Sequence, residues 1–211
     1  RRYGFEIHCL NTTSDTQVPS FVVVIEDKSG VGPKFCLGGG SQSNSAKALL
    51  RALEEAWSVY YWMRRTTPYS LPESYQPFND DSITQNARLR LWANPEMAAH
   101  YSFLLAGKEY QFSEPSFSYP REFISEKEEL KFLVRQIENL GRGYEVYYYP
   151  AQHQILSQLG YFSARVIVPQ LISLYLRETM APLGASRLKE VPPKLNQKPA
   201  DEFNPWPHPF P

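Results

Sequence analysis

Hydrophobic positions early in the chain follow patterns typical of β-strands. Residues 5–10 and 20–26 have strand-like patterns, and residues 33–37 form a shorter apolar stretch. The second segment is a continuous β-branched run, which is typical of a buried strand. Three glycines follow at 38–40. We expect them to end the third strand and to form a turn into a helix.

The clearest periodicity predicts one helix over about residues 45–65. Apolar residues recur there at steps of three and four, as on one face of an α-helix. This face contains Ala46, Leu49, Leu50, Leu53, Trp57, Tyr60 and Tyr61. The four that we expect to be buried are Leu49, Leu50, Leu53 and Trp57. A different face of the same helix contains Arg51, Glu55, Ser58 and Trp62.

The second half of the chain mixes helical and extended segments. Residues 66–82 hold three prolines and predict a long loop. Helical patterns occupy residues 95–106 and 125–140, and extended patterns occupy residues 143–149 and 162–168. Strands and helices alternate without regular βαβ units. We therefore expect an α+β fold of one main domain, with a mixed sheet and packed helices.

Prolines alternate with aromatic rings at the end of the chain, in Pro205-Trp206-Pro207-His208-Pro209-Phe210-Pro211. Each proline fixes φ at about −65° and holds the preceding residue extended. We expect residues 204–211 to form a stiff, extended polyproline tail on a main domain of residues 1–203. Such a rod can hold the Pro211 carboxylate still, for chemistry or for anchoring a ligand. The alternative is a linker or a docking peptide, the commoner role of proline-rich tails.

Composition is that of an ordinary globular protein. Its 22 basic and 22 acidic residues give no net charge, whereas nucleic-acid binders usually show a basic excess. No apolar run approaches the roughly 20 residues of a membrane span, so we expect neither nucleic acid nor membrane as a partner. Cys9 and Cys36 are too few for a disulfide framework, and no Cys/His spacing indicates zinc. We expect a cytoplasmic protein with reduced, buried thiols.

Three features could bind a ligand, and each has a plain structural alternative. The glycine-rich segment could place free N–H groups near an anion, or be a simple turn. Arg51 and Glu55 could form a surface ion pair, or Glu55 could bind Mg²⁺ beside a phosphate. Arg165, in an apolar strand, could point to solvent at an edge or could meet an anion.

These segments together resemble the C-terminal half of the YcaO family, ATP-dependent enzymes that modify peptide backbone amides. The final Pro-x-Pro-x-Pro-x-Pro resembles the C-terminus of that family. The glycines at 38–40, followed by Ala48-Leu49-Leu50-Arg51-Ala52-Leu53-Glu54-Glu55, resemble its glycine-rich turn and helix. Residues 164–169, Ala-Arg-Val-Ile-Val-Pro, resemble its late Arg-Val-x-Val-Pro strand.

The resemblance implies an enzyme that phosphorylates an amide oxygen with ATP and Mg²⁺. In cyclodehydratases of the family, a Cys, Ser or Thr side chain first adds to the preceding carbonyl, and an azoline ring results. It implies that Glu55 binds Mg²⁺, that Arg51, Arg165 and Ser58 help to bind the nucleotide, and that the Pro211 carboxylate is catalytic. The implied partners are a ribosomally made precursor peptide and a protein or domain that delivers it.

Two departures favour alternatives to a complete enzyme. Ser58 stands where the family usually has Gln, and no Glu-x-x-Arg occurs in the 211 residues. Because the chain starts at Arg1 without a methionine, we expect a missing N-terminal half to carry that motif, and we expect this chain alone not to hydrolyse ATP. The alternatives are a degenerate, non-catalytic scaffold, a thioamide-forming relative, and an interaction module whose tail binds an SH3-like groove.

Overall fold

A computed structural model describes residues 3–110 and 123–210 of the chain. Its main sheet has three strands in the order β1 (Phe5–Asn11), β2 (Ser20–Asp27) and β3 (Phe35–Ser41). Both pairings are antiparallel, with Val24 opposite His8 and Leu37. The α+β class is confirmed, but the described sheets are antiparallel instead of mixed.

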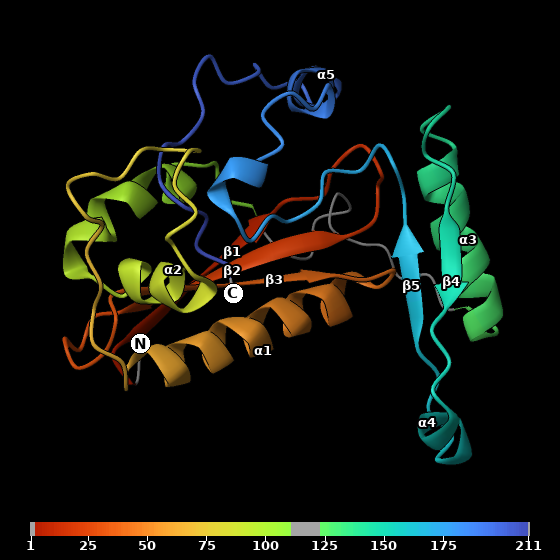
Figure 1. Ribbon diagram of the computed structural model, residues 1–211, viewed down its shortest axis with the longest axis horizontal. Coiled ribbons are helices and arrows are strands. Elements are labelled where there is room, and N and C mark those ends of the chain that lie inside the picture. Colours follow the sequence, from red (N-terminus) through yellow and green to blue (C-terminus); the bar gives the residue numbers. More distant parts are fainter. Residues whose placement is uncertain (1–2, 111–122, 211) are drawn as a thin grey trace.

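Helices cover both faces of this sheet (Figure 1). Helix α1 (Ser45–Met63) lies along one face, where Phe21, Val23 and Ile25 pack against its alanines. Helix α2 (Gln85–Trp92) and the 3₁₀ helix η1 (Pro95–Leu105) join the core cluster that contains Val24. The sequence prediction of a buried second strand is confirmed, since Val23, Val24 and Ile25 are each at most 1% exposed.

The glycines at 38–40 belong to β3, and the predicted turn at this position is wrong. A Cβ atom on Gly38 would lie 2.2 Å from the backbone nitrogen of Ala56, and one on Gly40 would lie 2.2 Å from the carbonyl oxygen of Ala48. The glycines therefore let α1 pack so closely on β3 that no side chain fits between the two backbones at Gly38 and Gly40. Asn44 caps this helix, because its side chain accepts the N–H of Lys47.

The close approach also changes which side of α1 is buried. Its sheet-facing residues are the small Ala48, Ala52 and Ala56, spaced four apart. The prediction that four large residues are buried is wrong for Leu50 and Trp57, which are 55% and 49% exposed. Leu49 and Leu53 are half-buried beside the alanines.

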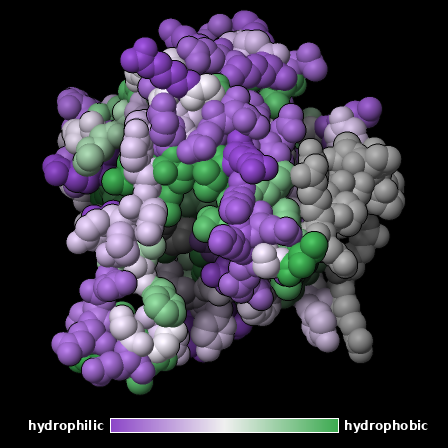
Figure 2. All heavy atoms as spheres, turned by 90° about the vertical axis from the view of Figure 1, so that its right-hand side faces the viewer, coloured by the Kyte–Doolittle hydropathy of each residue, from purple (hydrophilic) through white to green (hydrophobic). Residues whose placement is uncertain are grey.

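The second half of the chain is less tightly packed. Helix α3 (Glu126–Glu138) has no buried residue, and β4 (Tyr147–Pro150) pairs with β5 (Ala164–Ile167) in a separate two-stranded sheet. The short α4 (Gln154–Gln158) lies between these two strands in the chain. Figure 2 views this end of the molecule and shows apolar side chains at the surface among hydrophilic ones.

The chain then returns to the main sheet through η3 (Glu178–Met180) and α5 (Arg187–Lys194). Arg187 in α5 pairs with Asp15 at 2.5 Å, which joins α5 to the loop after β1. Pro192 and Pro193 lie inside α5. No helix in the described residues is long and apolar enough to cross a membrane.

Both cysteines are free thiols. Cys36 is buried beside Met63, as expected, and burial raises the pKa of its thiol well above the ordinary value. Cys9 is exposed on the edge strand β1, so the expectation that both thiols are buried is wrong for Cys9.

Candidate functional site

Glu55 lies where helix α1 passes the free edge of the main sheet. Among the described strands β3 is the last on that side, so some of its backbone groups have no neighbouring strand in this part of the chain. The N–H of Gly39 donates to Glu55 Oε2 at 2.5 Å. A hydrogen bond from a backbone N–H to a carboxylate is a strong one, and it fixes the direction of the half-buried Glu55 side chain.

The tail ends at the same place. Phe210 Cε1 and Glu55 Oε2 each lie 3.7 Å from the position that a Cβ atom on Gly39 would take. Gly39 thus leaves a small space that an edge N–H, a carboxylate and the last described ring share. Figure 1 shows the end of the tail reaching the sheet beside β3.

Hydrogen bonds hold the tail against the body of the protein. Trp92 Nε1–H donates to the carbonyl of Pro207 at 2.8 Å, and Pro207 is fully buried. His208 Nε2 donates to the carbonyl of Tyr175 at 2.6 Å. Tyr75 donates its hydroxyl to the carbonyl of Pro205 at 3.2 Å. The tail is therefore hydrogen-bonded to the body at three residues, Pro205, Pro207 and His208.

Aromatic contacts add to these bonds. The Trp206 ring lies 4.4 Å from His100 between centroids, and His208 makes an edge contact with Tyr175 at 4.9 Å. Burial lowers the pKa of the His208 imidazole, and the positive charge of Arg88 lowers it as well. His208 is therefore held in its neutral form over a wider pH range than an exposed histidine.

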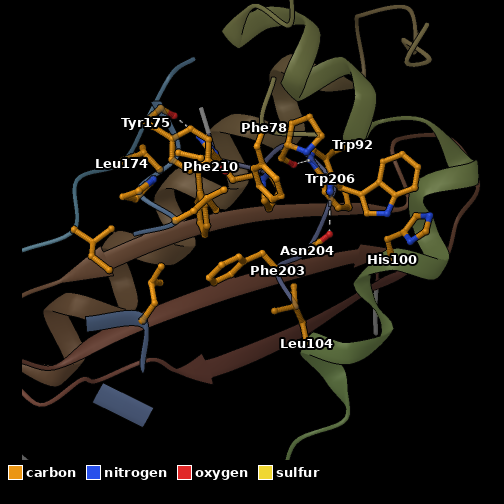
Figure 3. Close-up of a pocket in the computed structure, with 18 of the residues that line it drawn as sticks. Phe78, Trp92, His100, Leu104, Leu174, Tyr175, Phe203, Asn204, Trp206 and Phe210 are labelled. Atoms are coloured by element: carbon orange, nitrogen blue, oxygen red, sulfur yellow. Dashed lines mark hydrogen bonds between the residues drawn. The ribbon is translucent and has the colours of Figure 1, made fainter. Parts of the chain in front are cut away.

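An apolar cavity of about 550 Å³ lies beside the tail. Its wall includes Trp206 and Phe210 from the tail, Tyr101 and Leu104 from η1, and Leu174. Figure 3 shows the labelled rings gathered around this space. Phe210 lines this cavity and also lies beside Gly39, so the cavity and the Glu55 site are neighbours.

The structure does not bring all the predicted site residues together. Arg51 is exposed and pairs with Glu54 at 3.6 Å, not with Glu55. Ser58 is exposed, and its hydroxyl donates to the carbonyl of Glu54 at 2.8 Å within the same helix. Pro211, whose carboxylate was expected in the site, lies outside the described residues.

Arg165 lies away from the Glu55 site. It sits in β5, opposite Tyr149, and is exposed with all of that strand. Its guanidinium has no ion pair within the described part of the chain. Figure 1 places β5 in the separate two-stranded sheet, beyond the end of α1. Arg165 and Glu55, both expected to help bind Mg²⁺-ATP, therefore lie in separate parts of the fold.

The Glu55 carboxylate suits a divalent cation. Among the described residues only the Gly39 N–H is bonded to it, at Oε2, which leaves Oε1 for a ligand. Mg²⁺ is commonly held by one or two carboxylates together with substrate phosphate oxygens. A second cluster of possible ligands, Glu6, His8 and Glu26, is already occupied by a cation, because the Lys28 ammonium contacts both carboxylates.

Sequence reasoning missed the helix that holds the tail. Residues 85–92 were not predicted as helical, yet α2 supplies Trp92. Thr84 was an available signal, since its side chain caps the helix by accepting the N–H of Ala87 at 3.1 Å. No sequence pattern pairs Trp92 with Pro207 or Tyr175 with His208, because these contacts join distant segments.

Two solved structures have the same fold. The structure of the heterocyclase TruD matches 98% of this chain with a TM-score of 0.65 and 24% identity. A heterocyclase in complex with substrate and cofactor matches 100% with a TM-score of 0.68 and 22% identity. The chain spans about a quarter of each, 26% and 25%. No curated protein matches the sequence.

A family model matches most of the chain. It covers residues 1–172, and its description is YcaO cyclodehydratase, ATP- and Mg²⁺-binding. The matched part includes Glu55, the three glycines and the apolar strand of Arg165. It also includes α2, which binds the tail. The chain therefore belongs to the YcaO family.

Proposed function

We propose that this chain is part of an ATP- and Mg²⁺-dependent enzyme that forms thiazoline or oxazoline rings in a ribosomally made precursor peptide. The observation that carries the proposal is that Glu55, which accepts the Gly39 N–H, and Phe210, the last described tail residue, both lie beside Gly39. A metal ligand and a rigid tail that ends beside it are two parts that such a reaction uses. Family membership supports the cyclodehydratase chemistry.

Glu55 and the tail have separate roles in this proposal. Glu55 holds Mg²⁺ through its free carboxylate oxygen, while the Gly39 N–H keeps the side chain in place. The carboxylate of Pro211, the residue after Phe210, accepts the proton of the Cys, Ser or Thr that attacks the preceding carbonyl carbon. ATP, when bound, supplies the phosphoryl group that turns the former amide oxygen into a leaving group.

The remaining predicted residues keep smaller roles. Arg51 is exposed one turn before Glu55 and can swing from Glu54 toward a phosphate. Ser58 is one turn beyond it and can do the same with its hydroxyl. Arg165 is exposed in β5 and contacts the nucleotide if the β4–β5 sheet moves or if another copy or chain brings it there.

The direct test uses the complete protein with its precursor peptide. We expect an ATP-dependent loss of one water per ring, measured by mass spectrometry, and loss of this product in Glu55→Gln. Replacement of oxygen by sulfur would instead identify a thioamide-forming enzyme. An unchanged peptide mass with a folded, peptide-binding protein would overturn the enzymatic proposal.

A non-catalytic scaffold is the second candidate. The absence of Glu-x-x-Arg from the 211 residues and the presence of Ser58 in place of Gln favour it. A scaffold would bind the precursor peptide, or the protein that delivers it, without ATP turnover. Isothermal titration with Mg²⁺-ATP separates the two candidates, because the scaffold has no need to bind the nucleotide.

A further inference from the structure

A fully buried ion pair lies behind the tail. Arg88 of α2 and Glu178 of η3 are both 0% exposed, and Arg88 Nη2 lies 2.9 Å from Glu178 Oε1. The same Nη2 also donates to the carbonyl of Leu176 at 3.1 Å. One guanidinium therefore fixes two points of the 176–178 segment to α2.

That segment is bonded to the tail one residue away. Tyr175, next to Leu176, accepts the hydrogen bond of His208. Helix α2 also holds the tail directly, because Trp92, one turn after Arg88, donates to Pro207. Pro207 is thus held by α2, and His208 is held by the segment at Tyr175. Arg88 fixes that segment to α2.

The ion pair is poorly suited to stability alone. Arg88 Nε and Nη1 and Glu178 Oε2 have no hydrogen-bond partner among the described residues. Removing two charges from water is costly, and apolar residues of similar size often stabilise a protein as well or better. A role in holding a precise geometry explains why the charged residues are here.

We infer that Arg88 and Glu178 are positioning residues that set the place of the tail end at the Glu55 site. The inference rests on the proposed function. If the 175–178 segment shifted against α2, His208 would move relative to Pro207, and Phe210 would leave its place beside Gly39. A shift of about 1 Å at a reacting group can reduce the rate roughly a hundredfold.

The test is the double variant Arg88→Met/Glu178→Leu in the complete protein. It removes both charges and keeps the volume, so we expect its melting temperature to stay within about 5 °C of the wild type. We expect hydrogen exchange at the Trp92 indole N–H, followed by NMR, to become at least about tenfold faster. We expect kcat for peptide modification to fall at least about tenfold, with KM for ATP unchanged.

Arg88→Lys covers the case in which the double variant does not fold. It keeps a positive charge, but the Lys side chain is shorter and its ammonium does not reach the place of Arg88 Nη2, which contacts both Glu178 and Leu176. Exchange should therefore rise and kcat should fall. The matched control is Lys198→Met/Asp201→Leu, which removes an exposed ion pair just before the tail and should change neither readout.

Native exchange and native kcat in a folded Arg88→Lys or double variant would overturn the inference. The exchange measurement does not need the peptide. It therefore still decides whether the pair positions the tail if the wild type modifies no peptide and the proposed function fails. Fast exchange with an unchanged kcat would show that the pair fixes the tail but that tail position has no catalytic role, which also contradicts the inference.

Discussion

Glu55 Oε2 and Phe210 Cε1 both lie 3.7 Å from the position that a Cβ atom would take on Gly39. A helix from the first third of the chain and the last described residue therefore meet at one point on the edge of the sheet. Only a glycine leaves this space open. The three glycines thus have different roles, since Gly38 and Gly40 face the helix backbone.

This difference predicts a large effect of alanine at one glycine and a small effect at its neighbour. Gly38→Ala should lower the free energy of unfolding by about 3 kcal/mol, because its Cβ would lie 2.2 Å from a backbone atom of α1. Gly39→Ala should change it by less than about 1 kcal/mol, since its nearest contacts are ordinary. Urea unfolding measures both, with Gly107→Ala, which has open space, as the control. Equal effects at Gly38 and Gly39 would contradict the packing.

Glu55→Gln should remove the negative charge of the side chain and keep its hydrogen bond to the Gly39 N–H. The amide oxygen of Gln can still accept the Gly39 N–H, so folding should persist while the cation loses its ligand. We expect ATP turnover by the complete protein to fall about a hundredfold. Glu54→Gln is the matched control, because Glu54 is exposed and its carboxylate pairs, among the described residues, with the Arg51 side chain alone. Similar turnover in the two variants would remove Glu55 from the site.

Trp92→Phe should loosen the tail. The change removes the indole N–H and leaves the buried carbonyl of Pro207 without its donor, a loss of about 1–3 kcal/mol in the free energy of unfolding. Trp62→Phe, at a partly exposed position on α1, should change it by less than about 0.5 kcal/mol. Thermal unfolding of both variants provides the comparison, and an unaffected Trp92 variant would show that this bond does not hold the tail.

His208 should make the protein less stable in mild acid. Burial lowers the pKa of its imidazole below the ordinary 6.5, so the unfolded chain binds a proton more readily than the folded one. Stability should therefore fall as the pH drops from about 7 to about 5. His208→Gln keeps a donor for the Tyr175 carbonyl and should remove this part of the pH dependence, whereas His153→Gln, at an exposed position, should not. Identical pH profiles for all three proteins would contradict the burial of His208.

The sequence predicted α1 and the main strands better than it predicted their packing. Periodicity identified a helix near residues 45–65 because any amphipathic face has the same spacing. It could not show that the glycines of β3 let α1 approach closely, so that the side of the helix with small alanine residues faces the sheet. Large residues such as Leu50 and Trp57 then lie at the surface.

The candidate site was only partly predictable for a similar reason. Glu55 was found from its resemblance to a family motif, and its place beside the tail depends on a strand edge that no local pattern reveals. Arg165 was placed in a strand correctly, but a strand pattern does not specify which sheet it joins. Arg88 and Glu178 are far apart in the chain and have no motif, so only the fold brings them together.

The most direct test of the account is the addition of one glycine after Pro211 in the complete enzyme. The extension moves the terminal carboxylate outward and leaves the Trp92–Pro207 and His208–Tyr175 bonds in place. We predict that azoline formation falls about a hundredfold, while the melting temperature and Mg²⁺-ATP binding stay unchanged. Cyclisation of the peptide at the native rate by the extended enzyme would show that the terminal carboxylate has no catalytic role, and would leave the tail as a docking segment only.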